Sequence, residues 1–215
     1  MAMRLVSLNL GQARQVTYHG ETVGTGIFKV PVQDAVRVLR RTLEGDRQVD
    51  LRFHGGEDKA VYCYPHEHYA FWAAELGRDD LVPGQFGENF TTEGLLETDV
   101  HIGDRYRVGT AIFEVTQPRV PCFKLGIRMG DAGIVKRFMA AKRTGWYFRV
   151  IQEGTLQAGD AISQLSKGKT GLSVYAVNEL HFFDDGNQAA IRAALEEPAL
   201  SKSWREELNE LLPRS

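Results

Sequence analysis

The sequence has only two cysteines, Cys63 and Cys122, and no apolar run that approaches the roughly 20 residues of a membrane-spanning helix. The apolar part of the opening segment MAMRLVSLNL is too short for a secretory signal. We therefore expect a cytoplasmic protein without a membrane anchor. In that reducing compartment the two cysteines are expected to remain thiols and not to form a disulfide.

The sequence also lacks the glycine-rich loops that bind nucleotides. It has no G-x-G-x-x-G segment, so neither a flavin nor a nicotinamide fingerprint is present. Gly168-Lys169-Thr170 matches the end of a phosphate-binding P-loop, but the glycine required five residues earlier is Ser163. Neither motif therefore predicts a bound nucleotide cofactor.

Charge is present in ordinary amount but is unevenly distributed. Charged residues make up 25% of the chain, and the formal net charge is -2. Residues 119–149 contain eight basic residues against one acid, a balance of +7, whereas residues 66–104 contain nine acids against one arginine, a balance of -8. This asymmetry indicates that one region meets an anion. The basic residues are scattered and no nucleic-acid motif surrounds them, so a compact phosphate is favoured over a nucleic-acid polymer.

Short β-branched and aromatic runs dominate the chain up to about Gly168, and they predict strands in a barrel or sandwich. Two helices interrupt them, one from Pro65 to a cap at Gly77 and one over 131–145. The strand-like runs are RLVSLNL (4–10), IFKVPV (27–32), QVDLRF (48–53), AVYCY (60–64), DRYRVG (104–109), AIFEVTQ (111–117) and WYFRVI (146–151).

The last part of the sequence reads as helix only. Three segments with apolar residues at three- and four-residue spacing begin at Ser173, Asn187 and Ser201, each of which is a good N-cap residue. We therefore predict a β-rich domain over 1–168 and a small three-helix module over 169–215.

A first candidate site follows the predicted strand over 48–53. His54, Gly55, Gly56 and Lys59 combine paired glycines, which expose backbone N–H groups, with two cationic donors. This pattern fits an anion-binding corner and fits a tight turn with solvated charges equally well.

His66 and His68 lie close together and invite the hypothesis of a zinc site. On a helix, however, residues two apart point in nearly opposite directions and cannot share a metal ion. A surface or capping role is therefore predicted for them. Cys63, inside a strand-like run, is predicted to be a small buried residue.

The segment QPRVPCFK holds the second cysteine in an unusually stiff stretch. Pro118 and Pro121 each fix one φ angle and favour an extended predecessor, so Arg119 and Cys122 keep a fixed relation. A neighbouring arginine favours the thiolate form of cysteine, which attacks electrophiles and binds soft metals. From the residues alone, a buried cysteine at the end of a strand, with the arginine outside, is slightly favoured.

Several motifs occur together in an order that resembles MOSC-domain proteins, which are named for the C-terminal domain of molybdenum-cofactor sulfurases, and within them the YiiM branch. The resemblance spans nearly the whole chain. The motifs are TGIFKVPV from Thr25, LEGDRQVD from Leu43, FHGGEDKAVYCYPHEHYAFW from Phe53, PGQFGENFTTEGL from Pro83, QPRVPCFKL from Gln117, GWYFRVIQEGTLQAGD from Gly145 and the helical ALSKSWREEL.

The resemblance implies a mainly β, MOSC-type barrel-like domain with peripheral helices that binds the molybdenum cofactor, a molybdenum dithiolene on a phosphate-bearing pyranopterin. It implies that Cys122 is the metal ligand, with Arg119 beside it, and that Asn89 contacts the pterin or the substrate. The candidates for binding the cofactor phosphate are Lys29, His54, Gly55, Gly56, Lys59, Arg119 and Arg149.

The resemblance further implies an oxidoreductase that reduces N-hydroxylated compounds, such as hydroxylaminopurine bases, to amines and so detoxifies them. Because the chain has no flavin or nicotinamide motif, the electrons are expected from a separate reductase. The alternative is a carrier that holds the cofactor or a persulfide on Cys122 without turnover. Association into a homodimer is left open.

Overall fold

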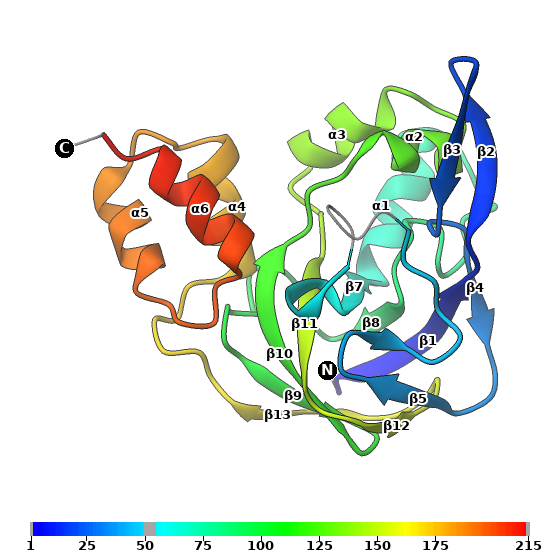
Figure 1. Cartoon of the computed structure of the whole chain (residues 1–215), viewed down its shortest axis with the longest axis horizontal. Helices are drawn as coiled ribbons and strands as arrows, with labels where there is room; N and C mark the ends of the chain where they lie inside the picture. Colours follow the sequence, from blue (N-terminus) through cyan, green and yellow to red (C-terminus); the bar gives the residue numbers. More distant parts are fainter. Residues whose placement is uncertain (1, 50–54, 214–215) are drawn as a thin grey trace.

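The computed structural model describes residues 2–49 and 55–213 of the chain (Figure 1). This described part contains thirteen strands, six α-helices and one short 3-10 helix. The strands are β1 (Arg4–Gly11), β2 (Arg14–Tyr18), β3 (Glu21–Thr25), β4 (Lys29–Val32), β5 (Val36–Leu39), β6 (Thr42–Leu43), β7 (Val61–Pro65), β8 (Phe90–Glu93), β9 (Arg105–Val108), β10 (Ala111–Pro118), β11 (Trp146–Gln152), β12 (Gly154–Leu156) and β13 (Ile162–Ser166). The helices are η1 (Glu57–Lys59), α1 (Glu67–Leu76), α2 (Phe123–Met129), α3 (Ile134–Ala140), α4 (Val174–Phe182), α5 (Gln188–Leu195) and α6 (Lys202–Glu210).

Eight strands form one large mixed sheet in the order β13-β9-β10-β11-β7-β8-β1-β4. The sheet curls until the start of β1 returns to the residues just before β13. There Arg4 bridges Ala161, and the Leu5 N–H donates to the carbonyl of Asp160 at 2.9 Å. The ladder is not continuous at this point, so the sheet is barrel-like without being a closed barrel. The predicted fold class is confirmed in this form.

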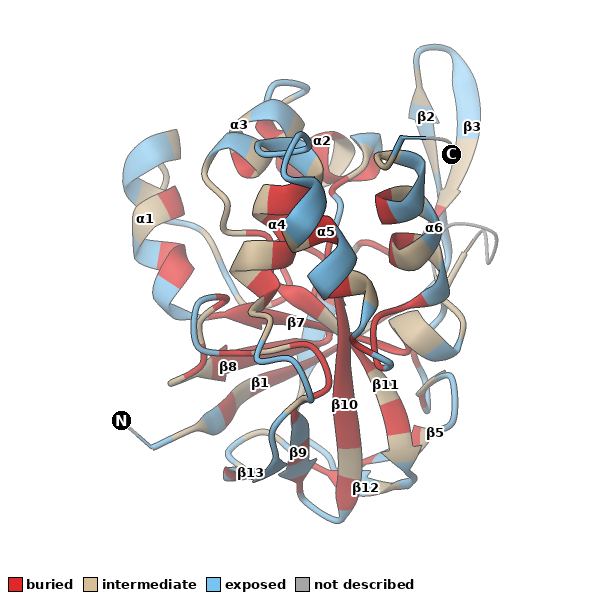
Figure 2. Ribbon diagram, turned by 90° about the vertical axis from the view of Figure 1, so that its left-hand side faces the viewer, coloured by how far each residue is buried: buried red, intermediate tan, exposed pale blue. Residues whose placement is uncertain are grey.

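The sheet and the C-terminal helices share the largest apolar core. Phe113 and Phe148 come from β10 and β11, and Val177, Trp204 and Leu208 come from α4 and α6; all five are at most 2% exposed. Strand β10 is buried along nearly its whole length, as Figure 2 shows. Helix α4 therefore covers a side of β10 that would be exposed to solvent if the sheet stood without the C-terminal helices.

A second apolar cluster holds α1, α2 and α3 near the other end of β7. Trp72, Phe86 and Phe138 are fully buried there, and the Trp72 and Phe138 rings stack with centroids 5.3 Å apart. The same cluster includes Tyr62 and Tyr64 of β7. Because β7 contributes to both clusters, its residues are fixed from two sides. In the described part of the chain, no helix is both long and apolar enough to cross a membrane.

The three C-terminal helices begin where the sequence predicts. The side chains of Ser173, Asn187 and Ser201 accept hydrogen bonds from the N–H groups of Ala176, Ala190 and Trp204, respectively. Each bond satisfies a backbone donor that the first turn of a helix leaves without a partner.

Replacing Asn187 by alanine is expected to destabilise the protein by about 1 kcal/mol, because the exposed first turn of α5 loses its cap. Urea unfolding of the variant should show a lower midpoint with an unchanged m-value. The neighbouring exposed Gln188 provides the control, since Gln188→Ala leaves the cap in place. Equal stability of the two variants would contradict this role for Asn187.

The fold differs from the prediction in several places, and seven of the thirteen strands were not predicted, namely β2, β3, β5, β6, β8, β12 and β13. Helix α3 ends at Ala140 and not at 145, because Lys142 takes a φ of 56°, which a right-handed helix excludes. Helix α2, directly after Cys122, was not predicted, although Gly130 with a φ of 67° is an ordinary helix stop. The predicted strand over 48–53 is not formed at residues 48 and 49, and its remainder lies outside the described residues.

Candidate functional site

The segment that carries Cys122 connects β10 to α2 and is fixed at both ends. Strand β10 ends at Pro118, and the next residue, Arg119, donates its N–H to the carbonyl of Gly145 at 3.1 Å. Cys122 has an extended backbone, with φ -119° and ψ 172°, and α2 begins at the following residue. The prediction that Arg119 and Cys122 keep a fixed relation is therefore consistent with the local structure.

Two cavities meet at Cys122. The smaller has a volume of about 100 Å³ and lies among β7, the end of β3 and the residues around Asp46. The larger has a volume of about 810 Å³ and lies between the β2–β3 hairpin and helices α4 and α6. Both cavities are lined by Val49, Lys59, Val120, Cys122, Lys124 and Tyr147. A molecule bound across them would pass directly over the Cys122 thiol.

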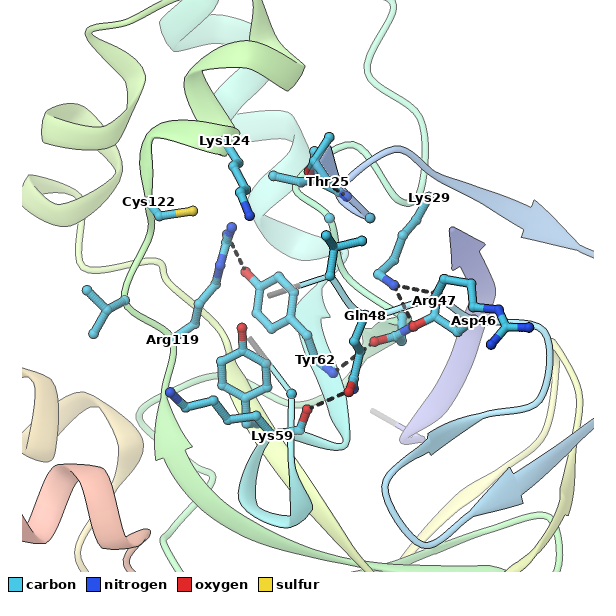
Figure 3. A pocket seen from close by; sticks show the side chains of 18 residues that line it. Thr25, Lys29, Asp46, Arg47, Gln48, Lys59, Tyr62, Arg119, Cys122 and Lys124 are labelled. Carbon is cyan, nitrogen blue, oxygen red and sulfur yellow. Dashed lines mark hydrogen bonds and ion pairs between the residues drawn. The ribbon is translucent and has the colours of Figure 1, made fainter. Parts of the chain in front are cut away.

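The smaller cavity is strongly cationic. Among the described residues, its lining contains five basic residues and one carboxylate, a net charge of +4; these residues are Lys29, Arg47, Lys59, Arg119, Lys124 and Asp46. Figure 3 shows Cys122, Arg119 and Lys124 on one side of this cavity and Lys29 with Asp46 on the other. Such a lining attracts an anion, and the volume suits a group the size of phosphate.

Arg119 is the most tightly held of these cations. Its side chain is buried, donates to the Tyr62 hydroxyl at 3.1 Å and lies over the Tyr62 and Phe138 rings. Burial alone lowers its pKa, but the neighbouring Tyr62, Tyr147 and Cys122 outweigh burial, and the net shift of the Arg119 pKa is upward. Arg119 therefore keeps its charge next to the thiol.

Lys29 and Asp46 form a buried ion pair at the far wall of the smaller cavity. The ammonium nitrogen lies 2.6 and 2.7 Å from the two carboxylate oxygens, and both residues are at most 7% exposed. Asp46 also accepts from the Gly11 N–H at 2.7 Å and from the Asn89 amide at 3.0 Å. Burial lowers the pKa of Lys29, and Asp46 partly opposes that shift. The charge of Lys29 therefore interacts mainly with Asp46.

Asn89 lines the smaller cavity, but protein groups engage its amide. The amide nitrogen donates to the Asn9 carbonyl at 3.2 Å and to Asp46, while its oxygen accepts from the Tyr62 N–H at 3.2 Å. It joins β1 to β7 beside the cavity. Direct contact of Asn89 with a ligand stays a prediction, and its observed contacts are those of a positioning residue.

The larger cavity has one wall made by the C-terminal helices. His181 and Phe182 of α4 and Trp204 and Glu207 of α6 line it opposite the Cys122 segment. Burial lowers the pKa of Lys59, and the charge of Glu207 partly opposes this shift. The charge of Glu207 in the C-terminal helices therefore interacts with Lys59 of the cationic site.

Two other predicted residues lie away from the lining. The Arg149 guanidinium bonds to Asp58 at 2.6 Å and to Glu114 at 3.1 Å, so it connects η1 to β10. Gly55 lines the smaller cavity, whereas Gly56, with a φ of 90°, caps η1. His54 lies outside the described residues.

The prediction for His68 needs correction. His66 is exposed, but His68 is 3% exposed and bonds through Nε2 to Glu97 at 2.7 Å. Its Nδ1 lies 3.0 Å from Arg143. The first turn of α1 faces inward at this position, so His68 takes part in a buried polar network and is neither a cap nor a surface residue.

Sequence reasoning missed most of the lining of the smaller cavity, including Arg47, Tyr62, Lys124 and Tyr147. Lys124 stands two residues after Cys122 and is only 7% exposed. Lys124 belongs to the segment QPRVPCFK, but its position in the lining could have been predicted only if α2 had been predicted as well. Tyr62 and Tyr147 are paired across β7 and β11, a register that single strand-like runs do not reveal.

The residues that line the two cavities suit a metal ion that is already bound to an organic cofactor. Among residues 2–49 and 55–213, no group of three or more His, Cys, Asp or Glu side chains could hold a bare metal ion. Cys122 instead offers one thiol between an anion-binding cavity and a larger one. A thiolate is a ligand for soft metals, and the cations would neutralise a phosphate on the same cofactor. The residues present therefore fit a phosphate-bearing metal cofactor.

Comparison with known proteins agrees with this geometry. A family model described as the MOSC domain matches residues 50–163. The chain is 45% identical to an uncharacterized protein, YflK, of Bacillus subtilis, over 94% of this chain and 90% of that protein. It is 34% identical to YiiM of Escherichia coli, over 84% and 81% of the two chains. It is also 33% identical over 82% of its length to a protein of Gibberella moniliformis named a reductase, of which the match covers 32%.

Solved structures of YiiM proteins are also similar to this chain. The crystal structure of YiiM from Geobacillus stearothermophilus superposes with a TM-score of 0.84 and 36% identity, covering 98% of this chain and all of that one. The YiiM structure from Escherichia coli has a TM-score of 0.77 and 27% identity, over 98% and 92% of the two chains. The chain therefore belongs to the MOSC-domain family, and within it to the YiiM branch.

Proposed function

We propose that this protein binds the molybdenum cofactor and reduces N-hydroxylated compounds, such as hydroxylaminopurine bases, to amines. The observation that carries the proposal is the position of Cys122, whose thiol lines both a cationic cavity and a much larger one. The similarity to a protein named a reductase supports a redox role.

The cofactor, when bound, supplies two-electron redox chemistry. Cys122 would be the protein ligand of its metal, and Arg119, Lys59 and Lys124 would bind its phosphate. The smaller cavity is too small for a whole pterin, so the remainder of the cofactor would extend past Cys122 into the larger cavity.

The proposed reaction consumes two electrons and two protons. It breaks the N–O bond of R–NHOH and gives R–NH₂ and water. A separate reductase would supply the electrons, since the sequence carries no flavin or nicotinamide fingerprint. The larger cavity leaves room for a base-sized substrate next to Cys122, which favours turnover over a carrier role.

Elemental analysis tests the proposal. Protein from a host that makes the cofactor should contain about one molybdenum per chain, as expected for a single Cys122 ligand. It should also convert a hydroxylaminopurine to the aminopurine with a reduced viologen as donor. The same protein from a host blocked in cofactor synthesis should contain no molybdenum and show no turnover. Turnover by the metal-free protein would refute the proposal.

A further inference from the structure

A buried carboxylate outside the described lining of both cavities supports the residues just before β11. Glu97 is 4% exposed, and its two oxygens bond to different parts of the chain. Oε1 accepts from the Gly145 N–H at 2.8 Å, and Oε2 lies 2.7 Å from Nε2 of His68. One carboxylate therefore joins the first turn of α1 to the residue that precedes β11.

The second partner of His68 determines the direction of the bonds to Glu97. Nδ1 of His68 lies 3.0 Å from the Arg143 guanidinium, which can only donate, so Nδ1 accepts and Nε2 carries the proton. Glu97 thus receives one N–H from His68 and one from Gly145. A carboxylate accepts both bonds, whereas the single oxygen of an amide leaves its NH₂ group facing one of the two donors.

Gly145 connects this network to the cationic site. It has a φ of 68°, and a Cβ at this position would collide with the carbonyl oxygen of Cys63, so the position requires glycine. The Gly145 carbonyl accepts from the Arg119 N–H at 3.1 Å. The N–H of Gly145 is therefore bonded to Glu97, and its carbonyl to Arg119.

The guanidinium of Arg119 is attached to the same segment by a second route. Its Nη1 donates to the Tyr62 hydroxyl at 3.1 Å, and that hydroxyl donates its one proton to the Thr144 carbonyl at 2.8 Å. Both ends of Arg119, the backbone N–H and the guanidinium, are thus bonded to residues 144–145, directly or through Tyr62. A shift of these residues on loss of Glu97 would move the guanidinium with them.

We propose that Glu97 is the positioning residue of Arg119, and that through Gly145 it holds the guanidinium in the orientation that binds an anionic group, the phosphate of the cofactor, in the smaller cavity. The inference rests on the proposed function, in which Arg119 binds that phosphate. Glu97 itself would not touch the ligand, because it lies outside the described lining. Its replacement should therefore weaken anion binding although every cation of the cavity is still present.

The test measures binding of inorganic phosphate to the full-length, molybdenum-free protein by titration calorimetry. Glu97→Gln should raise the Kd by about tenfold, the lower end of the usual cost of losing a group that orients a binding residue. In the Arg119→Gln background the same change should raise the Kd less than about twofold, since the residue that Glu97 positions is absent. Lys59 and Lys124 of the lining keep binding measurable in that background.

A second variant and a matched control complete the design. Should Glu97→Gln not fold, Glu97→Asp keeps the charge, withdraws the carboxylate by one methylene and takes its place in the same cycle. The control is Glu197, a buried carboxylate, 1% exposed, that accepts from the N–H groups of Thr170 at 2.9 Å and Ala199 at 3.2 Å and lies outside the described lining of both cavities. Glu197→Gln should lower Tm but leave the Kd for phosphate within about twofold of the wild type.

Three results would overturn the inference. They are an unchanged Kd in Glu97→Gln, an equal change of Kd with and without Arg119, and a loss of affinity in Glu197→Gln as large as in Glu97→Gln. A wild-type chain without measurable affinity for phosphate would refute the proposed anion site, and this inference with it. Failure of the proposed function alone would differ, as a wild-type protein that binds phosphate but acquires neither molybdenum nor turnover.

Discussion

Replacing Cys122 by alanine is expected to abolish both the bound molybdenum and the turnover of N-hydroxylated substrate. The reason is that, among the described residues that line either cavity, Cys122 is the one soft ligand. The measurement is molybdenum per chain by elemental analysis, together with kcat. The phosphate contacts proposed for Arg119 and Lys124 would remain in this variant, so we expect the metal-free pterin still to bind, more weakly.

The matched control is Cys63→Ala. Cys63 is fully buried beside Thr92, and burial raises the pKa of its thiol, so it stays protonated and inert. This variant should keep both metal and activity. Metal retained in Cys122→Ala would exclude Cys122 as the ligand. A mass increase of about 32 Da on Cys122 in metal-free wild-type protein, roughly one sulfur atom, would favour the carrier alternative.

Replacing Asp46 by asparagine is expected to destabilise the protein by about 3–5 kcal/mol, because it leaves the buried Lys29 ammonium without its counter-ion. For a chain of this size the loss corresponds to a fall in Tm of roughly 6–20 °C. The new amide also places an N–H₂ group where Lys29 and Asn89 now donate. Thermal unfolding at neutral pH measures the effect.

The pH dependence of the Asp46→Asn variant has a definite sign. Burial lowers the pKa of Lys29 from 10.5, and without Asp46 the lysine loses the main interactions that oppose this shift. Between the lowered pKa and 10.5 the unfolded chain binds more protons than the native one, so the stability of the variant rises with pH in that window. Its deficit relative to the wild type should shrink there.

The double variant Lys29→Met, Asp46→Asn provides the control for charge. It removes both charges at once and should recover most of the lost stability, since no unpaired ion remains. If the double variant is as unstable as Asp46→Asn alone, the loss comes from the bonds of Asp46 to Gly11 and Asn89 and not from the unpaired lysine.

The sequence predicts those parts of the fold that local chemistry determines. The helix caps at Ser173, Asn187 and Ser201 and the helix stop at Gly77 follow from residue type alone. The β2–β3 hairpin was not predicted, because its residues are mostly exposed and carry no apolar alternation. Tertiary contacts, which a single sequence does not display, determine the strand order and the parallel β7–β8 pair.

Two features of the candidate site could be predicted from the sequence, namely its cysteine and its positive charge. Arg119 and Cys122 stand in one stiff segment, so their proximity is a local property. The position of Arg149 outside the described lining could not be predicted, because basic sequence context does not reveal a partner such as Asp58, which is 91 residues away. His181 and Glu207 could not be predicted from spacing, because side-chain contacts between α4 and α6 and the packing of α4 on β10 bring them to the cavity.

The lining residues of the two cavities also become available at different times during synthesis of the chain. Tyr147 is the last residue made that lines the smaller cavity, whereas the larger one needs Glu207, 60 residues later. A nascent chain complete through β13 therefore already contains every lining residue of the cationic cavity, while its neighbour still lacks a wall.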